Sequence, residues 1–263
     1  MIVAGIDIGS LSTDTVILDK DKRILSYSIV ATGASSKKAC HTSFEKSIDQ
    51  ADIKREDIAF VLSTGYGRKS VDFANDQVTE ITCHARGLHF IHPQTRSIID
   101  IGGQDSKAIA INDRGKVMKF AMNDKCAAGT GRFLEVMARA LEIELEEMGD
   151  LSLLSEEAVS ISNMCTVFAE SEVISLIADG KPVEDIINGI HSSISGRVLG
   201  LLDRVGTKEV ISMSGGVAKN IGVVKAIEKK LGVTLYIPEE PQIIGALGAA
   251  LIALERIESG ERQ

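Results

Sequence analysis

The stretch IDIGSLSTDTVILDKDKRIL, residues 6–25, occurs a second time as IDIGGQDSKAIAINDRGKVM, residues 99–118. The copies align without a gap, because Gly9 and Gly102 are separated by the same 93 positions (102 minus 9) as the first residues of the two stretches (99 minus 6). Each copy has the pattern of a buried strand, a glycine turn and a hairpin of two further strands. We therefore expect an α/β chain with two homologous lobes.

The two glycine turns are candidates for phosphate binding. Glycine lets a phosphate approach the backbone closely, and the hydroxyl groups that follow Gly9 supply hydrogen-bond donors. An acidic residue lies just before each turn, at Asp7 and Asp100, where a carboxylate can hold Mg²⁺ through water. Two such loops at a common cleft would clamp a polyphosphate, so the duplication predicts a nucleotide site.

A second pattern, a cysteine ahead of an amphipathic helix, also occurs twice. Cys126 lies in NDKCAAGTGRFLEVMARAL, residues 123–141, and Cys165 lies in SNMCTVFAESEVISLIADG, residues 162–180. The candidate helix caps are Asp124 or Thr130 in the first stretch and Ser162 or Asn163 in the second. The second helix has an apolar stripe of Val167, Phe168, Ile174 and Ile177. A helix start is electropositive and stabilises a thiolate or an anionic cluster, so the two cysteines predict a half-site for a metal cluster.

Periodicity and turn residues predict the elements between these motifs. We expect helices at about 36–51, 80–90 and 183–204, a helix ending near 230, and strands at 58–63, 209–214 and 233–237. The loop from Thr64 to Arg68 is an exposed turn, or Arg68 contacts phosphate or a partner. Glycines at the strand-to-helix turn near Gly215 suit close approach by a base or ribose. The small residues 245–250 predict tight helix packing or a hinge, with packing favoured.

Cys83 and His84 are adjacent on an expected helix and allow two interpretations. They could be metal ligands. Neighbouring positions on a helix point in different directions, however, which favours a small buried cysteine and an ordinary polar histidine.

Composition limits the classes of function. The chain has 263 residues, 44% of them apolar, which is ample for a large core. Its net charge of -8 and pI near 5.2 argue against nucleic acid as a partner. The N-terminus lacks a basic leader and no apolar run is long enough to span a bilayer, so we expect no membrane and a cytoplasmic protein. Four cysteines without a Cys-x-x-Cys pair suggest thiols or ligands in a reducing compartment.

The motifs together resemble a known superfamily. The chain is similar to the actin, sugar kinase and Hsp70 ATPases through Asp7-x-Gly9-Ser10, residues 100–105, residues 215–217 and residues 245–248. More narrowly, it resembles the activators of 2-hydroxyacyl-CoA dehydratases, which are related to the ATPase subunits of benzoyl-CoA reductase. The specific stretches are residues 64–68, 100–105, NDKCAAGTGRF from Asn123 and CTVFAESEVIS from Cys165.

The resemblance implies a fold, a cofactor and partners. The fold is the two-lobed, duplicated ribonuclease H-like fold, with a helix-cluster-helix dimer interface. Cys126 and Cys165 from each protomer of a homodimer would ligate one four-iron four-sulfur cluster, which takes four thiolates. ATP would drive an electron into a dehydratase or a double-cubane-type iron-sulfur protein, and a ferredoxin or flavodoxin would supply it.

The resemblance also implies roles for single residues. Asp7, Asp100, Gln104 and Asp105 are the expected catalytic residues; Asp7 and Asp105 are the expected Mg²⁺ ligands. ATP or ADP is expected to contact Gly9, Ser10, Leu11, Ser12, Thr13, Gly102, Gly103, Gln104, Gly215, Gly216, Val217 and Gln242. One position departs from the family pattern, because Asp14 stands where the family has a lysine, whereas Lys107 fills that place in the second copy.

Two other functions stay open at this point. A small-metabolite kinase of the same superfamily would use the cysteines as core residues or redox-sensitive thiols, and would need a base beside an acceptor hydroxyl. A nucleotide-sensing scaffold without iron would bind ATP but transfer no electron. For the domains, we expect a first lobe at 1–95, to which a C-terminal helix at about 243–263 returns, and a second lobe at 96–242.

Overall fold

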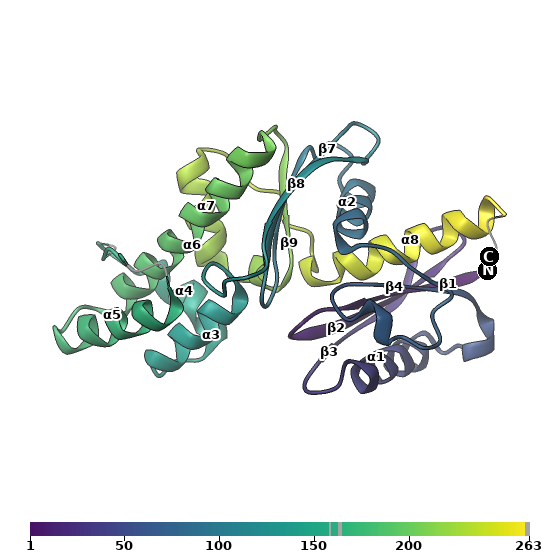
Figure 1. Ribbon diagram of the computed structural model, residues 1–263, viewed down its shortest axis with the longest axis horizontal. Coiled ribbons are helices and arrows are strands. Elements are labelled where there is room, and N and C mark those ends of the chain that lie inside the picture. The colour runs from purple at the N-terminus through teal and green to yellow at the C-terminus, as the bar shows by residue number, and fades with distance from the viewer. Residues whose placement is uncertain (158, 163–164, 261–263) are drawn as a thin grey trace. The chain divides into compact units, whose positions relative to one another are not determined.

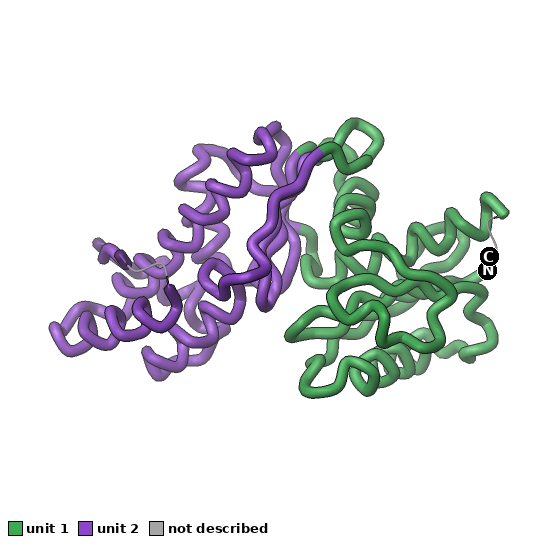
Figure 2. Tube along the Cα trace, in the orientation of Figure 1, with its two compact units in different colours: residues 1–96, 111–118, 238–263 green, residues 97–110, 119–237 purple. Residues whose placement is uncertain are grey.

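A computed structural model describes residues 1–157, 159–162 and 165–260 of the chain (Figure 1). The chain forms two compact units (Figure 2). Unit 1 comprises residues 1–96, 111–118 and 238–263, and unit 2 comprises residues 97–110 and 119–237. Each unit therefore combines segments that are distant in the sequence.

Unit 1 is built on a five-stranded sheet with the order β3-β2-β1-β4-β5. Its strands are β1 (Ile2–Ile8), β2 (Ser12–Asp19), β3 (Ile24–Ala31), β4 (Ile58–Thr64) and β5 (Asp76–Gln77). The central strand β1 pairs antiparallel with β2 and parallel with β4. All of its residues from Val3 to Ile8 are buried, which requires that both faces of the sheet be covered.

Helices supply that cover. They are α1 (Ser36–Ala51), α2 (Glu80–Ile91) and α8 (Ile244–Glu258). Helix α1 lies on one face of the sheet and α8 on the other, with α2 packed along α8 (Figure 1). The small residues at the start of α8 allow this contact, because a Cβ at Gly248 would overlap the backbone of Cys83. The tight packing predicted for residues 245–250 is confirmed.

Unit 2 contains most of a second sheet, with the order β8-β7-β6-β9. The strands are β6 (Ser97–Ile101), β7 (Ser106–Ile111), β8 (Val117–Asn123) and β9 (Ile211–Ser214). The helices are α3 (Gly131–Ala140), α4 (Met148–Ser152), α5 (Thr166–Ala178), α6 (Val183–Val205) and α7 (Ile221–Leu231). Strand β6 pairs antiparallel with β7 and parallel with β9, which repeats the arrangement around β1.

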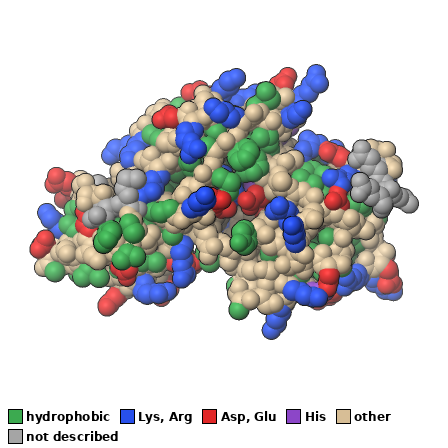
Figure 3. Space-filling view, viewed as in Figure 1, with side chains coloured by type: hydrophobic (Ala, Val, Ile, Leu, Met, Phe, Trp, Pro, Cys, Tyr) green, Lys and Arg blue, Asp and Glu red, His purple; other side chains and the backbone are tan. Residues whose placement is uncertain are grey.

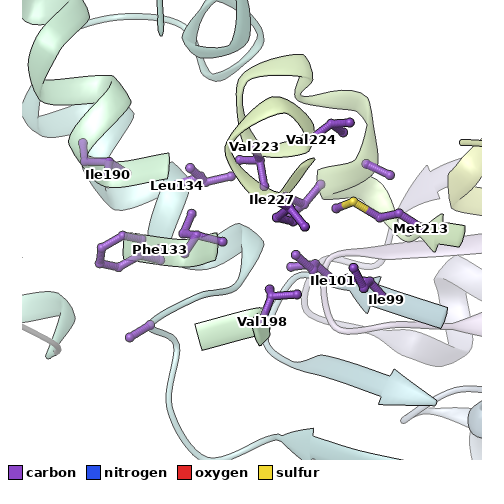
Figure 4. Packing of buried hydrophobic residues seen from close by; sticks show 14 of the residues in the cluster. Ile99, Ile101, Phe133, Leu134, Ile190, Val198, Met213, Val223, Val224 and Ile227 are labelled. Carbon is purple, nitrogen blue, oxygen red and sulfur yellow. The ribbon is translucent and has the colours of Figure 1, made fainter. Parts of the chain in front are cut away.

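The core of unit 2 fixes α3 against this sheet. Figure 4 shows buried side chains from β6, β9, α3, α6 and α7 in one cluster, among them Ile99, Ile101, Met213, Phe133, Leu134, Ile190, Val198, Val223, Val224 and Ile227. Phe133 and Leu134 are both 2% exposed, and burial of such a side chain contributes about 1.5–3 kcal/mol. Helix α3 is therefore held firmly beside β6, the strand that carries Asp100.

The sequence repeat is also a repeat of hydrogen bonds. The Gly9 amide donates to the Ser12 carbonyl at 2.9 Å, and at the same offset the Gly102 amide donates to the Asp105 carbonyl at 3.0 Å. In the two hairpins, Asp19 and Asn112 accept from the equivalent amides through their side chains. The turns and hairpins of the two copies are therefore built in the same way.

Most expected elements are present. Helix α1 has the expected bounds, and α6 extends one residue beyond its expected end. The strand expected at 233–237 is wrong, because only Tyr236 pairs there, in an isolated bridge to Ser212. Within the described residues, no helix is long and apolar enough to cross a membrane.

Candidate nucleotide and cysteine sites

In unit 1, the first glycine turn follows Asp7 at the end of β1. The hydroxyl of Thr32 donates to the Gly9 carbonyl and lies 2.9 Å from the hydroxyl of Thr13. The amide of Thr32 donates to the Leu11 carbonyl at 2.9 Å. Thr32, the residue directly after β3, thus stabilises the turn. The turn residues Gly9, Ser10, Leu11 and Ser12 are half-buried.

In unit 2, the second turn carries a network of opposite charges. The ammonium of the buried Lys107 lies 3.0 Å from Oδ2 of Asp100 and 2.7 Å from Oδ1 of Asp105. The Ser214 hydroxyl donates to Oδ1 of Asp100 at 2.9 Å. Both carboxylate oxygens of Asp100 therefore have a partner, which fixes the orientation of a nearly fully buried acid.

A glycine with positive φ stands beside each of these aspartates. Gly65 follows β4 and Gly215 follows β9, and both have φ +86, a conformation that favours glycine. A Cβ at Gly65 would overlap Oδ1 of Asp7, and one at Gly215 would lie 2.9 Å from Oδ1 of Asp100. The carboxylate of each aspartate thus lies between the glycine turn that follows its own strand and the glycine that follows the neighbouring parallel strand.

The remaining predicted nucleotide residues fall in both units. Gly216 and Val217 begin the 3-10 turn η4 (Gly216–Lys219) of unit 2, where Val217 is buried in the core. Gln104 is exposed on the second turn. Gln242 lies in η5 (Pro241–Ile243) of unit 1, and its main-chain N–H donates to the side chain of Glu240 at 3.1 Å. The structure thus joins Gly102, Gly103, Gln104, Asp100, Asp105 and Gly215 in one group, and Asp7 with residues 9–13 in another.

Asp14 occupies the register position of the lysine in the other copy. It lies directly opposite Asp7 in the pairing of β1 with β2, as Lys107 lies opposite Asp100. Asp14 is buried, and its Oδ2 accepts from the Ser12 hydroxyl at 3.1 Å. Like charges directly opposite each other are unfavourable, so the first copy needs another way to hold Asp7.

Cys126 and Cys165 are exposed free thiols, each ahead of a helix. Cys126 lies in the loop before α3, and the Asn123 side chain donates to its carbonyl at 2.8 Å. Cys165 is the residue immediately before α5, and α3 and α5 pack against each other. The predicted cap Thr130 does stand before α3, but its hydroxyl donates to the Ala127 carbonyl instead of accepting from the helix.

The other predicted cap is wrong. Helix α5 begins at Thr166, and the Ser162 hydroxyl donates to Glu172 at 2.9 Å. Asn163 lies outside the described residues.

Helix α3 begins directly on the second glycine turn. The Gly131 amide donates to the Gly102 carbonyl at 2.9 Å, and the Arg132 amide donates to the Gly103 carbonyl at 2.8 Å. These are the first two residues of the helix, whose amides have no partner within the helix itself. The second turn is therefore joined to the start of α3 by two main-chain hydrogen bonds.

The apolar stripe of α5 faces outward. Val167 is 65% exposed, Phe168 62%, Ile174 54% and Ile177 39%, whereas Ala169 and Val173 are buried. Figure 3 shows hydrophobic side chains gathered at the surface over α5, at the left of the view. An apolar patch of this kind marks an interaction surface, and it lies on the helix that Cys165 precedes.

The two other cysteines are unsuited to metal binding. Cys83 is fully buried, and burial raises the pKa of its thiol to about 12. Cys40 is also buried, and burial raises the pKa of its thiol. The prediction that Cys83 is a small buried residue is confirmed.

The sequence favoured an ordinary polar role for His84 and did not predict its burial beside Asp7. His84 is 5% exposed, and its Nε2 lies 3.8 Å from Oδ2 of Asp7. The available signal was its helical spacing from Leu88, which predicts a buried position, but only the tertiary structure brings it to Asp7.

The duplicated sheets and their paired glycine turns define the actin and sugar kinase fold. That fold is shared with a glucokinase of the ROK family from Streptomyces griseus, which is 16% identical with a TM-score of 0.60 over 97% of this chain and 100% of that one. The prediction of a duplicated ATPase fold is confirmed.

The chain belongs to the BadF/BadG/BcrA/BcrD ATPase family, whose pattern matches residues 4–253. It is 48% identical to an activator of lactoyl-CoA dehydratase from Anaerotignum propionicum over 97% of this chain and 98% of that one. It is 34% identical to one of the subunits of benzoyl-CoA reductase from Thauera aromatica, over 95% and 92% of the two chains. The predicted relation to dehydratase activators and benzoyl-CoA reductase subunits is confirmed, and the chain is an ATPase.

A solved structure supports the same conclusion. The activator of 2-hydroxyisocaproyl-CoA dehydratase from Clostridium difficile, with bound ADPNP, is 44% identical and has a TM-score of 0.94 over 99% of this chain and 97% of that one. Binding of ATP or ADP by this chain follows from its family and from that neighbour.

Proposed function

We propose that this ATPase activates a 2-hydroxyacyl-CoA dehydratase or a related iron-sulfur partner by ATP-driven transfer of one electron. The observation that carries the proposal is the direct bonding of the second glycine turn to the start of α3, with the exposed Cys126 just ahead of that helix. The named relatives act on dehydratases, which supports the choice of partner. A ferredoxin or flavodoxin is the proposed electron donor.

For the nucleotide, each turn has a defined task. Residues 9–13 and 102–104 would bind the phosphates through backbone amides and hydroxyls, and Gly215, Gly216, Val217 and Gln242 would contact the nucleoside. Asp7 and Asp105 would hold Mg²⁺, and Asp100 and Gln104 would organise the attacking water. The fit is supported by the Asp105 side chain, which remains 24% exposed on the second turn while Lys107 lies 2.7 Å from its Oδ1.

The two exposed cysteines fit an iron-sulfur cluster shared by two protomers. Within the described residues there is no group of three or more His, Cys, Asp or Glu that could hold a metal ion. A four-iron cluster takes four thiolates, so Cys126 and Cys165 of two copies would complete one. When bound, such a cluster supplies one-electron transfer at low potential. The chain itself would supply the thiolates, from the loop before α3 and from the residue before α5.

The exposed stripe of α5 supports the homodimer. Val167 and Phe168 lie two and three residues after Cys165, so a second copy that shares the cluster would also cover this apolar surface. Burial of these side chains contributes roughly 25 cal/mol per Å² of apolar area removed from water. All four cysteines are free, which supports a reducing, cytoplasmic compartment.

Coupling between ATP and the cysteines would run through α3. Nucleotide can shift a conformational equilibrium only by its different affinity for the two states. The Gly102 and Gly103 carbonyls accept hydrogen bonds from the first two main-chain amides of α3. A turn that closes on phosphate would therefore move the start of that helix and the position of Cys126 in the loop before it.

The test is anaerobic purification followed by iron and sulfide analysis of Cys126→Ala and Cys165→Ala, with Cys83→Ala and Cys40→Ala as matched controls. We expect each of the first two changes to abolish iron binding while ATP hydrolysis persists, and the controls to keep their iron. Iron retained in both single variants would overturn the cluster assignment. An iron-free wild-type protein would indicate a nucleotide-sensing scaffold, or a kinase if it also phosphorylates a small metabolite.

A further inference from the structure

The two copies differ in the group that holds the aspartate at the end of the first strand. Asp100 is held by Lys107 from the neighbouring strand β7, and by Ser214 at the end of β9. In the other copy, the position equivalent to Lys107 is Asp14, as the sheet register shows. The position equivalent to Ser214 is Thr64, which lies opposite Asp7 in the parallel pairing of β1 with β4.

In the first copy, a side chain of a helix faces Asp7. His84 of α2 is 5% exposed, and its Nε2 lies 3.8 Å from Oδ2 of Asp7, within ion-pair distance. The N-terminal end of α2 therefore contributes His84 to the surroundings of Asp7.

Helix α8 closes the arrangement from the other side. A Cβ at Gly245 would overlap Oδ2 of Asp7 and would lie 3.1 Å from Nε2 of His84. A Cβ at Gly65 would overlap the other oxygen, Oδ1. Two glycines thus leave just enough room for the carboxylate and the imidazole to lie together, and any side chain at Gly245 would force them apart.

We propose that His84 is a positioning residue for Asp7, and that it takes the part in this lobe that Lys107 takes in the other. The inference rests on the nucleotide role proposed above for Asp7. A carboxylate that acts on Mg²⁺ or water must be held in one orientation, and a neighbouring donor that fixes such a carboxylate typically changes activity about 10- to 100-fold when it is removed.

The experiment compares His84→Gln with His84→Leu in the full chain. Glutamine keeps a side-chain N–H donor and leucine does not. We measure kcat and KM for ATP hydrolysis, the Kd of a non-hydrolysable ATP analogue by calorimetry, and thermal unfolding by circular dichroism. His89→Gln is the matched control, because it is a half-buried histidine on the same helix and does not face Asp7.

We expect His84→Leu to lower kcat about 10- to 100-fold with the Kd of the analogue changed less than about 3-fold, and His84→Gln to stay within about 3-fold of the wild-type kcat. In the double variant His84→Leu with Asp14→Lys, the new lysine restores the partner found in the other copy, so kcat should recover. Wild-type kcat in a folded His84→Leu, or a folded double variant without recovery, would overturn the inference.

Should His84→Leu fail to fold, His84→Asn takes its place, because its shorter amide does not reach Asp7; wild-type kcat in that variant has the same meaning. Asp7→Asn is measured in parallel. Normal hydrolysis in Asp7→Asn would remove the nucleotide role of Asp7 itself, whereas a loss there with normal hydrolysis in His84→Leu would overturn only the positioning role of His84.

Discussion

His191 should make the stability of unit 2 depend on pH. It lies on α6 and is fully buried, with its Nε2 3.4 Å from the Asn220 side chain. Its Nδ1 is buried without a hydrogen-bond partner among the described residues. Burial lowers the pKa of this imidazole to about 4, against about 6.5 in an unfolded chain. Between these values the unfolded state binds the proton and the folded state does not, so stability falls as the pH falls below about 6.5.

The expected size follows from the two pKa values. From about pH 7.5 to about pH 5, the histidine should remove about 2 kcal/mol from the free energy of unfolding, and the full loss of about 3.4 kcal/mol is reached only below about pH 4. The assay is urea unfolding followed by circular dichroism, because the chain has no tryptophan. His191→Gln is the comparison, since glutamine keeps polar atoms in place but does not titrate. Equal losses of stability in the two proteins over this range would refute the reasoning.

Three further outcomes are expected. Asp7→Asn and Asp100→Asn should each impair ATP hydrolysis without loss of iron, as measured by phosphate release and iron content; normal hydrolysis in both would contradict the two-turn site. Gly131→Pro should weaken activation of a dehydratase, because proline lacks the main-chain N–H that donates to the Gly102 carbonyl; unchanged activation would show that this bond carries no coupling. Exposure to air should bleach the visible absorbance and abolish activation while circular dichroism stays near native; a colourless anaerobic protein that still activates would exclude a cluster mechanism.

The sequence predicted those features that depend on local rules. The glycine turns at Gly9 and Gly102, and the hairpins at Asp19 and Asn112, are closed by hydrogen bonds between residues two to four positions apart. Their geometry therefore follows from the local sequence alone. The exposed cysteines were likewise predictable, since each stands ahead of a recognisable helix.

The sequence did not predict features that depend on distant segments. His84 acquires its role only because α2 and α8 bring it together with Gly245, which lies far along the chain. The apolar residues of α5 have the spacing of a core-facing stripe, and periodicity cannot distinguish a stripe that faces the core from one that awaits a partner. Ser162 does not cap α5 for a similar reason, because its hydroxyl donates a hydrogen bond to the carboxylate of Glu172, ten residues further along the chain.

The bonds between the second turn and α3 have a consequence for divergence and engineering. They join the carbonyls of Gly102 and Gly103 to the amides of Gly131 and Arg132, so no side chain takes part. Point substitutions on the outer surfaces of α3 and α5 should therefore leave the connection between the turn and the helix in place. An insertion between the turn and the helix would instead alter that connection. The length of chain between residues 103 and 131 should thus be kept when the exposed face of either helix is redesigned.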